Sequence, residues 1–250
     1  MSNTRTFTAI GKTTKNTVSS DKPNEDFIKY DNINKIYILL DGVTVDRIDG
    51  KYPNPSPARD VAHLFGEYVY KILSTQIDLV YPELAIKKAI YEGNLKIKEY
   101  NNTYNPPFDA GVVGIVSIIK DDIFYYSYIG DCSGRIFTED YIDLFTIEQT
   151  RMVRENKKSL TTYEIRHIIC NNINHPYGYG VWDGKSGALD FVVSGTKKIS
   201  NGAYIVLSSD GYEELLSKLS FADIKLLLPL NASVVSSLSS RDDKSIIIIH

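Results

Sequence analysis

Residues 36–42 read IYILLDG, and residues 204–211 read YIVLSSDG. Each is a short run of apolar, β-branched and aromatic residues, which is typical of a buried strand, and each ends in an aspartate followed by glycine. A carboxylate at the end of such a strand must be solvated, cap the backbone or hold a cation, because burial of an unpaired charge is costly. The glycine allows the chain to turn sharply beside it. Asp41 and Asp210 are therefore candidate ligands of a cation.

Two further acidic sites share this setting at the edge of an apolar strand. Asn24, Glu25 and Asp26 precede the first run, and Asp242 and Asp243 lead into the apolar residues 246–249. A single Asp-Gly is common in turns and proves nothing, but four acidic sites in one strand-edge context favour a shared role. Magnesium and manganese prefer oxygen ligands, commonly a few carboxylates with backbone carbonyls and water. The pattern thus indicates a metal site built from both ends of the sequence.

The rest of the chain predicts an α+β fold rather than a regularly alternating one. Two long segments, 57–74 and 82–100, have helical spacing and begin with proline, and shorter helices are expected at 211–219, 221–228 and 233–240. Asp121 and Asp122 predict a hairpin turn. Strands are expected at residues 5–10, 36–40, 111–119, 123–129, 134–137, 204–207 and 245–249.

Composition narrows the function classes. The chain has 250 residues, which suits one large domain over 1–250, and residues 146–179 are polar and weakly patterned, as in a flap insertion. The net charge is −3 and lysine and arginine are not clustered, which argues against a nucleic-acid-binding protein. No apolar run is long enough to cross a membrane. Cys132 and Cys170 form no C-x-x-C pair, so we expect free thiols in a reducing cytoplasm.

Five motifs in order resemble those of the protein phosphatase 2C family. They are Asn24-Glu25-Asp26, Asp41-Gly42, Gly130-Asp131, Ser209-Asp210-Gly211 and Asp242-Asp243-Lys244-Ser245. Each is weak alone, but their order and approximate separation match the family over residues 5 to 249. The resemblance implies a four-layer α/β/β/α sandwich, in which two antiparallel sheets pack face to face between helix pairs and metal ions lie at one edge.

The resemblance also implies a role for each matched residue. Asp41 would bridge two Mn²⁺ or Mg²⁺ ions, Asp210 and Asp242 would complete the ligands of one ion, and the Gly42 carbonyl would bind the other. Glu25 and Asp26 would orient water, and Asp131 would help to hold a weakly bound third ion. A cation pair lowers the pKa of a shared water from about 15.7 towards 7, and the resulting hydroxide would attack phosphoserine or phosphothreonine.

The match departs from the family at the phosphate clamp. Many members carry arginine five residues before the last aspartate of the Asn-Glu-Asp motif, whereas this chain has Asp21 there and Lys22 beside it. Lysine binds phosphate as a point charge without the bidentate geometry of arginine, so Lys22 is the candidate substitute, with Arg5 or Lys12 as further options. The histidine that often follows the first Asp-Gly is also missing.

Three readings of function stay open at this point. The first is a phosphoprotein phosphatase, acting on a phosphorylated protein substrate and opposing a serine/threonine kinase. The second is a pseudophosphatase that keeps the fold and serves as a binding or regulatory module, which the missing arginine favours and the complete acidic set disfavours. The third is a metal-dependent phosphoesterase acting on a small molecule, for which the shape of residues 146–179 would decide.

Overall fold

The computed structural model describes residues 5–16, 21–43, 51–75, 81–106, 109–227 and 242–250. Two five-stranded sheets form its centre. The strands are β1 (Ala9–Thr14), β2 (Phe27–Asp31), β3 (Ile36–Gly42), β4 (Val112–Lys120), β5 (Ile123–Ile129), β6 (Ser133–Phe137), β7 (Ile142–Leu144), β8 (Val193–Lys198), β9 (Tyr204–Ser208) and β10 (Lys244–Ile249). The α-helices are α1 (Pro57–Thr75), α2 (Pro82–Tyr104), α3 (Arg151–Asn156), α4 (Glu213–Leu216) and α5 (Phe221–Leu227).

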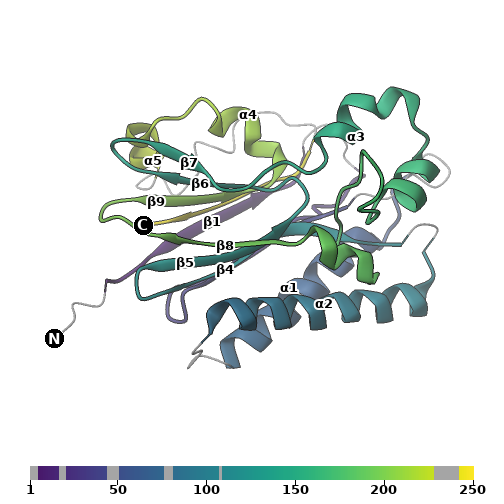
Figure 1. Cartoon of the computed structure of the whole chain (residues 1–250), viewed down its shortest axis with the longest axis horizontal. Coiled ribbons are helices and arrows are strands. Elements are labelled where there is room, and N and C mark those ends of the chain that lie inside the picture. Colours follow the sequence, from purple (N-terminus) through teal and green to yellow (C-terminus); the bar gives the residue numbers. More distant parts are fainter. Residues whose placement is uncertain (1–4, 17–20, 44–50, 76–80, 107–108, 228–241) are drawn as a thin grey trace.

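Both sheets are antiparallel throughout. One has the order β1-β10-β9-β6-β7 and the other β2-β3-β4-β5-β8. They lie face to face, with α1 and α2 outside the second sheet and α4 and α5 outside the first (Figure 1). This arrangement confirms the predicted α+β sandwich of four layers.

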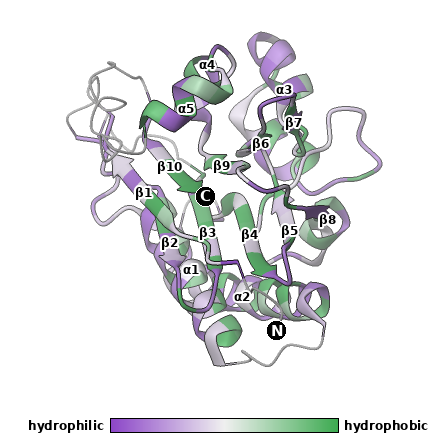
Figure 2. Cartoon of the chain, turned by 90° about the vertical axis from the view of Figure 1, so that its left-hand side faces the viewer, coloured by the Kyte–Doolittle hydropathy of each residue, from purple (hydrophilic) through white to green (hydrophobic). Residues whose placement is uncertain are grey.

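The core follows from these layers. One hydrophobic cluster joins the facing sides of the sheets and continues beneath α1 and α2, with Leu39, Phe65 and Trp182 among its fully buried members. A smaller cluster around Val206, Tyr212 and Ile248 lies between the first sheet and the helices above it. Figure 2 shows hydrophobic residues concentrated on central strands such as β3, β4 and β10. The sheets therefore form a rigid base for the loops at their ends.

The structure differs from the sequence-based expectation mainly at the sheet edges. The strand expected at residues 5–10 is β1, which begins at Ala9 and continues through polar residues to Thr14 because it pairs with β10. Strands β2, β7 and β8 were not predicted, and each is the outer strand of its sheet. The helix expected at 211–219 is a 3₁₀ turn, η4 (Asp210–Tyr212), followed by the short α4. The helix expected at 233–240 lies outside the described residues.

Other local predictions are confirmed. Asp121 and Asp122 both have positive φ, 51° and 58°, in the tight turn that joins β4 to β5. Cys132 and Cys170 are free thiols. Among the helices that the structure describes, none has the length and hydropathy needed to span a lipid bilayer.

Residues 146–179, which the sequence predicts as a flap insertion, contain short helical turns. These are α3, the 3₁₀ turn η1 (Lys157–Ser159) and the π-helical turn η2 (Glu164–Ile169). They lie beyond one end of the two sheets, away from the two ends of the chain (Figure 1). We call residues 146–179 the flap below.

Candidate active site

The sheet topology brings the predicted aspartates to one edge of the sandwich. Asp41 ends β3, and Asp26 directly precedes β2, whose first residue pairs with Leu40 of β3. Asp131 lies two residues beyond β5, which runs antiparallel to β4 beside β3. Neighbouring antiparallel strands begin and end at the same edge, so these three carboxylates, far apart in sequence, meet there.

The facing sheet supplies two more aspartates in the same way. Asp210 follows β9 and begins η4, and Asp242 lies just before β10, which pairs antiparallel with β9. Ser209 Oγ donates to Asp26 Oδ2 at 3.0 Å and accepts from the Ser245 amide at 2.9 Å. This serine thus joins the two sheets directly behind the aspartates, a role that no sequence pattern predicts.

Glycine follows Asp41 and Asp210 because of close packing rather than because of a sharp turn. A Cβ atom on Gly42 would lie 2.7 Å from the Ala58 carbonyl oxygen and 2.8 Å from that of Glu25. A Cβ atom on Gly211 would lie 2.2 Å from the Asp243 carbonyl oxygen. Such contacts are shorter than any side chain tolerates, so glycine is required because another backbone passes close to each aspartate.

Lys22 lies inside the acidic cluster. Its Nζ is 2.8 Å from Asp242 Oδ1, 3.6 Å from Glu25 Oε2 and 3.8 Å from Asp243 Oδ2. The lysine side chain is 6% exposed, while Asp242 is 47% exposed and so faces the solvent side of the group. These carboxylates raise the pKa of Lys22 against the effect of burial, so the ammonium stays charged.

Asp243 and Glu25 complete the support for this lysine. Asp243 is buried and accepts from the backbone amides of Asn16, at 2.8 Å, and Glu25, at 2.9 Å. Ser56 Oγ donates to Glu25 Oε1 at 2.6 Å. Asp243 therefore ties the segment before β2 to the segment before β10, a structural role that the sequence did not predict.

Asp131 is held from the flap side. Thr150 Oγ1 donates to Asp131 Oδ2 at 2.9 Å, and Thr150 directly precedes α3. Burial is the main cause that raises the pKa of Asp131. The flap is thus bonded to the acidic cluster at the root of its first helix.

Burial and mutual repulsion raise the pKa values of Asp41, Asp26 and Asp210. Burial, reinforced by Asp26, Asp210, Asp131 and Asp242, raises the pKa of Asp41 well above its usual range. Burial together with Asp243 raises the pKa of Asp26 to about 7, and burial with Asp131 and Asp242 raises that of Asp210 to about 8. Several carboxylates held this close require added positive charge before all can ionise at neutral pH.

The residues fit a hard, hydrated cation. Asp26 Oδ1 and Asp210 Oδ1 are buried oxygens that have no hydrogen-bond partner among the described residues, which is costly unless a cation or water is bound there. Within the described part of the chain, no group of three or more His, Cys, Asp and Glu side chains has the geometry of a metal site. Mg²⁺ and Mn²⁺ commonly take only one or two carboxylates and keep several waters, so the oxygen-rich cluster suits them better than a closed cage would.

A cavity of about 350 Å³ opens above the cluster. Its lining includes Asp41, Gly42, Asp131 and Asp242 from the sheets. The flap contributes Arg154, Lys157 and Arg166, together with Tyr179 at its end. These four predicted metal residues and the basic residues of the flap therefore border the same cavity, and sequence analysis identified only the flap as a segment, not its basic residues.

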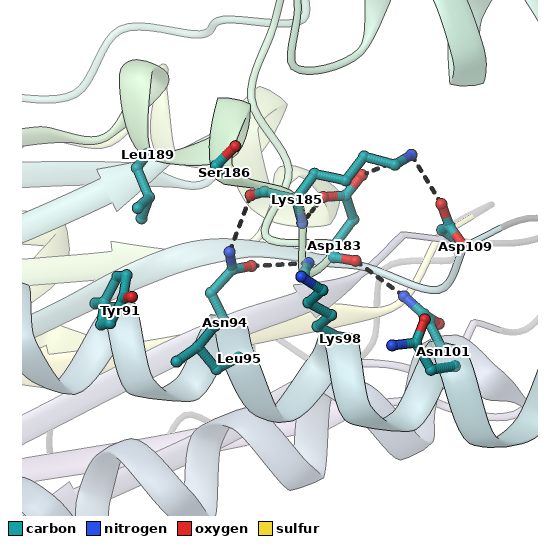
Figure 3. Close-up of a pocket in the computed structure, with 12 residues that line it drawn as sticks. Tyr91, Asn94, Leu95, Lys98, Asn101, Asp109, Asp183, Lys185, Ser186 and Leu189 are labelled. Atoms are coloured by element: carbon teal, nitrogen blue, oxygen red, sulfur yellow. Dashed lines mark hydrogen bonds and ion pairs between the residues drawn. The ribbon is translucent and has the colours of Figure 1, made fainter.

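A second hollow, between α2 and residues 183–186, serves a structural purpose. Asn94 accepts from the Gly184 amide at 2.9 Å and donates to the Lys185 carbonyl at 3.0 Å. Asn101 donates to the carbonyl oxygens of Ala110 and Asp183, both at 2.9 Å. Figure 3 shows both amides directed from α2 toward this loop. Their bonding capacity is used to fix the loop that follows Tyr179 and Val181 of the active-site cavity.

Comparison with solved structures assigns the fold. The catalytic domain of the serine/threonine phosphatase PstP, solved with two manganese ions, aligns with a TM-score of 0.68 at 14% identity, covering 97% of both chains. The serine/threonine phosphatase of S. agalactiae aligns at 0.66 and 20% identity, covering 98% of this chain and 99% of that one. MsPP of Mycobacterium smegmatis, a PPM phosphatase solved with cacodylate, aligns at 0.61 and 13%, covering 97% of each.

No protein-family model and no curated protein matches the sequence. The structural likeness extends over nearly the whole chain, so the predicted protein phosphatase 2C fold is confirmed. The individual roles of Asp41, Gly42, Asp210, Asp242, Glu25, Asp26, Asp131 and Lys22 stay predictions, although the structure brings these residues together around one edge of the sandwich.

Proposed function

We propose that the chain is a metal-dependent phosphoprotein phosphatase, a divergent member of the protein phosphatase 2C family, that hydrolyses phosphoserine and phosphothreonine. One observation carries the proposal. Aspartates from five separate parts of the sequence meet beside one cavity, where two buried carboxylate oxygens have no hydrogen-bond partner in the described part of the chain. A fold shared with serine/threonine phosphatases supports it.

The proposed ligands are Asp41, the Gly42 carbonyl, Asp210 and Asp242, with Asp131 near a third, weaker position. When bound, two Mn²⁺ or Mg²⁺ ions would activate water and neutralise the charge of the phosphate. Glu25 is held by Ser56, and Asp26 by Ser209, so both carboxylates can orient water from fixed positions. Asp131 is likewise fixed by Thr150. A contact between Lys22 and phosphate stays a prediction.

The substrate would be a phosphorylated protein, and a serine/threonine kinase acting on the same targets would be its counterpart. We also propose a cytoplasmic location, in line with two free cysteines. The open cavity beside the acidic cluster supports a substrate that is presented on a larger surface.

The test is hydrolysis of p-nitrophenyl phosphate and of a phosphothreonine peptide, with Mn²⁺, with Mg²⁺ and with chelator. We expect turnover only with metal, and a loss of about a hundredfold or more in Asp41→Asn, because loss of an outer-shell partner alone typically costs about 10–100-fold and Asp41 is a proposed direct ligand. Asp121→Asn, in the β4–β5 turn, is the matched control and should keep full activity. Activity in the presence of chelator would contradict the proposal.

A second candidate is a pseudophosphatase that binds phosphoproteins without hydrolysing them. Asp21 in place of arginine favours it. Binding of Mn²⁺ without any turnover of either substrate would support this reading. Turnover of p-nitrophenyl phosphate and small phosphate esters, but not of phosphopeptides, would instead indicate a small-molecule phosphoesterase.

A further inference from the structure

The active-site cavity has one acidic wall and one basic wall. The acidic wall is formed by Asp41, Asp131 and Asp242 at the ends of the strands. The basic wall is formed by Arg154, Lys157 and Arg166 of the flap. A phosphate monoester that approaches the acidic wall carries negative charge itself, so cationic side chains are needed on its outer side.

Lys22 is poorly placed to supply that charge. Its side chain is 6% exposed, and its ammonium is shared among Asp242, Glu25 and Asp243 on the acidic side of the cavity. The buried charge of Asp243 requires this partner, since an unpaired carboxylate in that position would be costly. Lys22 therefore compensates charge inside the protein.

The three basic side chains of the flap differ in the contacts that they make within the protein. Arg154 forms an ion pair with Glu148, with Nη1 2.8 Å from Oε1 and Nη2 2.8 Å from Oε2. The ammonium of Lys157 forms no ion pair within the described part of the chain, and it follows the end of α3. Arg166 is half-buried, and its Nη2 lies 3.4 Å from the Val43 carbonyl oxygen.

The position of Arg166 is the most informative. Val43 follows Gly42 directly, so the guanidinium lies one residue from the proposed metal-binding carbonyl, on the cavity side. Arginine presents several donors in a planar fork that matches a phosphate, so a guanidinium that lines the cavity beside the metal-binding edge is placed to contact a phosphate bound there. Lys157 adds a mobile point charge from the neighbouring turn of the flap.

We propose that Arg166, assisted by Lys157, binds the phosphate group of the substrate in place of the arginine that the chain lacks before Asp26; this rests on the proposed phosphatase function. The clamp then comes from the flap rather than from the segment before β2. Phosphate affinity would depend on how the flap is held, and Thr150, bonded to Asp131, fixes its first helix to the acidic wall.

Direct binding tests the inference without relying on turnover. The Mn²⁺-loaded protein would be titrated with inorganic phosphate by calorimetry, and Mn²⁺ affinity would be measured separately. We expect Arg166→Met to weaken phosphate binding roughly tenfold or more, as for loss of a charge-assisted hydrogen bond, and Lys157→Met several-fold. Arg166→Lys should recover part of the loss. Mn²⁺ affinity should change by less than about twofold.

Arg151→Met is the matched control, because Arg151 is a flap cation on α3 that is exposed, pairs with Glu155 and does not line the cavity. With p-nitrophenyl phosphate, Arg166→Met should raise KM and the inhibition constant of phosphate more than it lowers kcat. Unchanged phosphate affinity in Arg166→Met and Lys157→Met, in a wild type that hydrolyses the substrate, would overturn the inference and leave the proposed function intact. Loss of phosphate affinity in Lys22→Met alone would assign the phosphate to Lys22 instead. A loaded wild type that binds no phosphate would also overturn it.

Discussion

A buried ammonium at Lys22 neutralises carboxylates that belong to two distant segments of the chain. Lys22→Met would remove the ammonium that lies 3.6 Å from Glu25 and 3.8 Å from the buried Asp243, and removing one partner of a buried ion pair typically costs about 3–5 kcal/mol. We expect a fall of roughly this size in the free energy of unfolding, measured with denaturant and chelator. Asp243→Asn in the same chain should restore part of it.

Lys29→Met provides the comparison for Lys22→Met. Lys29 pairs with Glu67 at 3.2 Å, but the two side chains are 34% and 55% exposed. An exposed pair of this kind contributes less than about 1 kcal/mol. Equal destabilisation by the two substitutions would show that the Lys22 cluster does not act as a buried charge network.

Some residues of the acidic cluster could be predicted from the sequence, and others could not. Asp41 and Asp210 could be identified because a carboxylate after an apolar strand violates the usual pattern. The roles of Asp243 and Ser209 could not be identified from the sequence. Asp243 stands next to a second aspartate, Asp242, and nothing in the sequence distinguishes their roles. Ser209 is an ordinary serine at a strand end, and its bond to Asp26 exists only because the two sheets pack face to face. No sequence pattern identifies Arg166 and Lys157 as site residues, because only the folding of the flap brings them to the cavity.

At the level of elements, the loop that follows Tyr179 and Val181 depends on two buried asparagines of α2. Asn101→Ala would remove bonds to Ala110 and Asp183 and leave buried backbone groups unpaired, at about 1–3 kcal/mol for each group. We expect a clearly lower melting temperature. Asn102→Ala, on an exposed position of the same helix lining the same hollow, should leave it unchanged. Equal melting temperatures of the two variants would show that the hydrogen bonds of Asn101 do not stabilise the fold.

Central strands and long helices were predictable, and sheet edges were not. The strands β3, β4, β5, β9 and β10 are apolar because neighbours cover them on both sides, and α1 and α2 show a clear helical period. The outer strands β2, β7 and β8 contain charged residues, which edge positions tolerate and often favour. Their patterns resemble loops until pairing partners are known.

The whole molecule should respond to pH through its acidic cluster. The folded-state pKa values of Asp26 and Asp210, about 7 and about 8, lie above the ordinary value of 3.8. Raised carboxyl pKa values stabilise the fold at low pH, and this contribution is lost as pH rises through them. His63 acts in the opposite direction, but its lowered pKa confines its effect to below about 6.5.

We therefore expect the chelated protein to melt at a lower temperature at pH 8.5 than at pH 6.5, by scanning calorimetry. Asp210→Asn should show a smaller decrease, because it removes one of the carboxyl groups with a raised pKa. Mn²⁺ should suppress the decrease in the wild type by pairing with the ionised carboxylates. A melting temperature that rises across this interval without metal would contradict the assigned pKa directions.

Strand β10 lies between β1 and β9, although it contains residues 244–249 and β1 begins at Ala9. During synthesis the first sheet cannot close until this stretch has left the ribosome, so the edge of β1 that pairs with β10 stays unpaired while more than two hundred intervening residues are added. Asp242 arrives with the same segment. A nascent chain would therefore lack the proposed site until β10 is inserted, and a truncation before residue 242 would lose the fold together with that site.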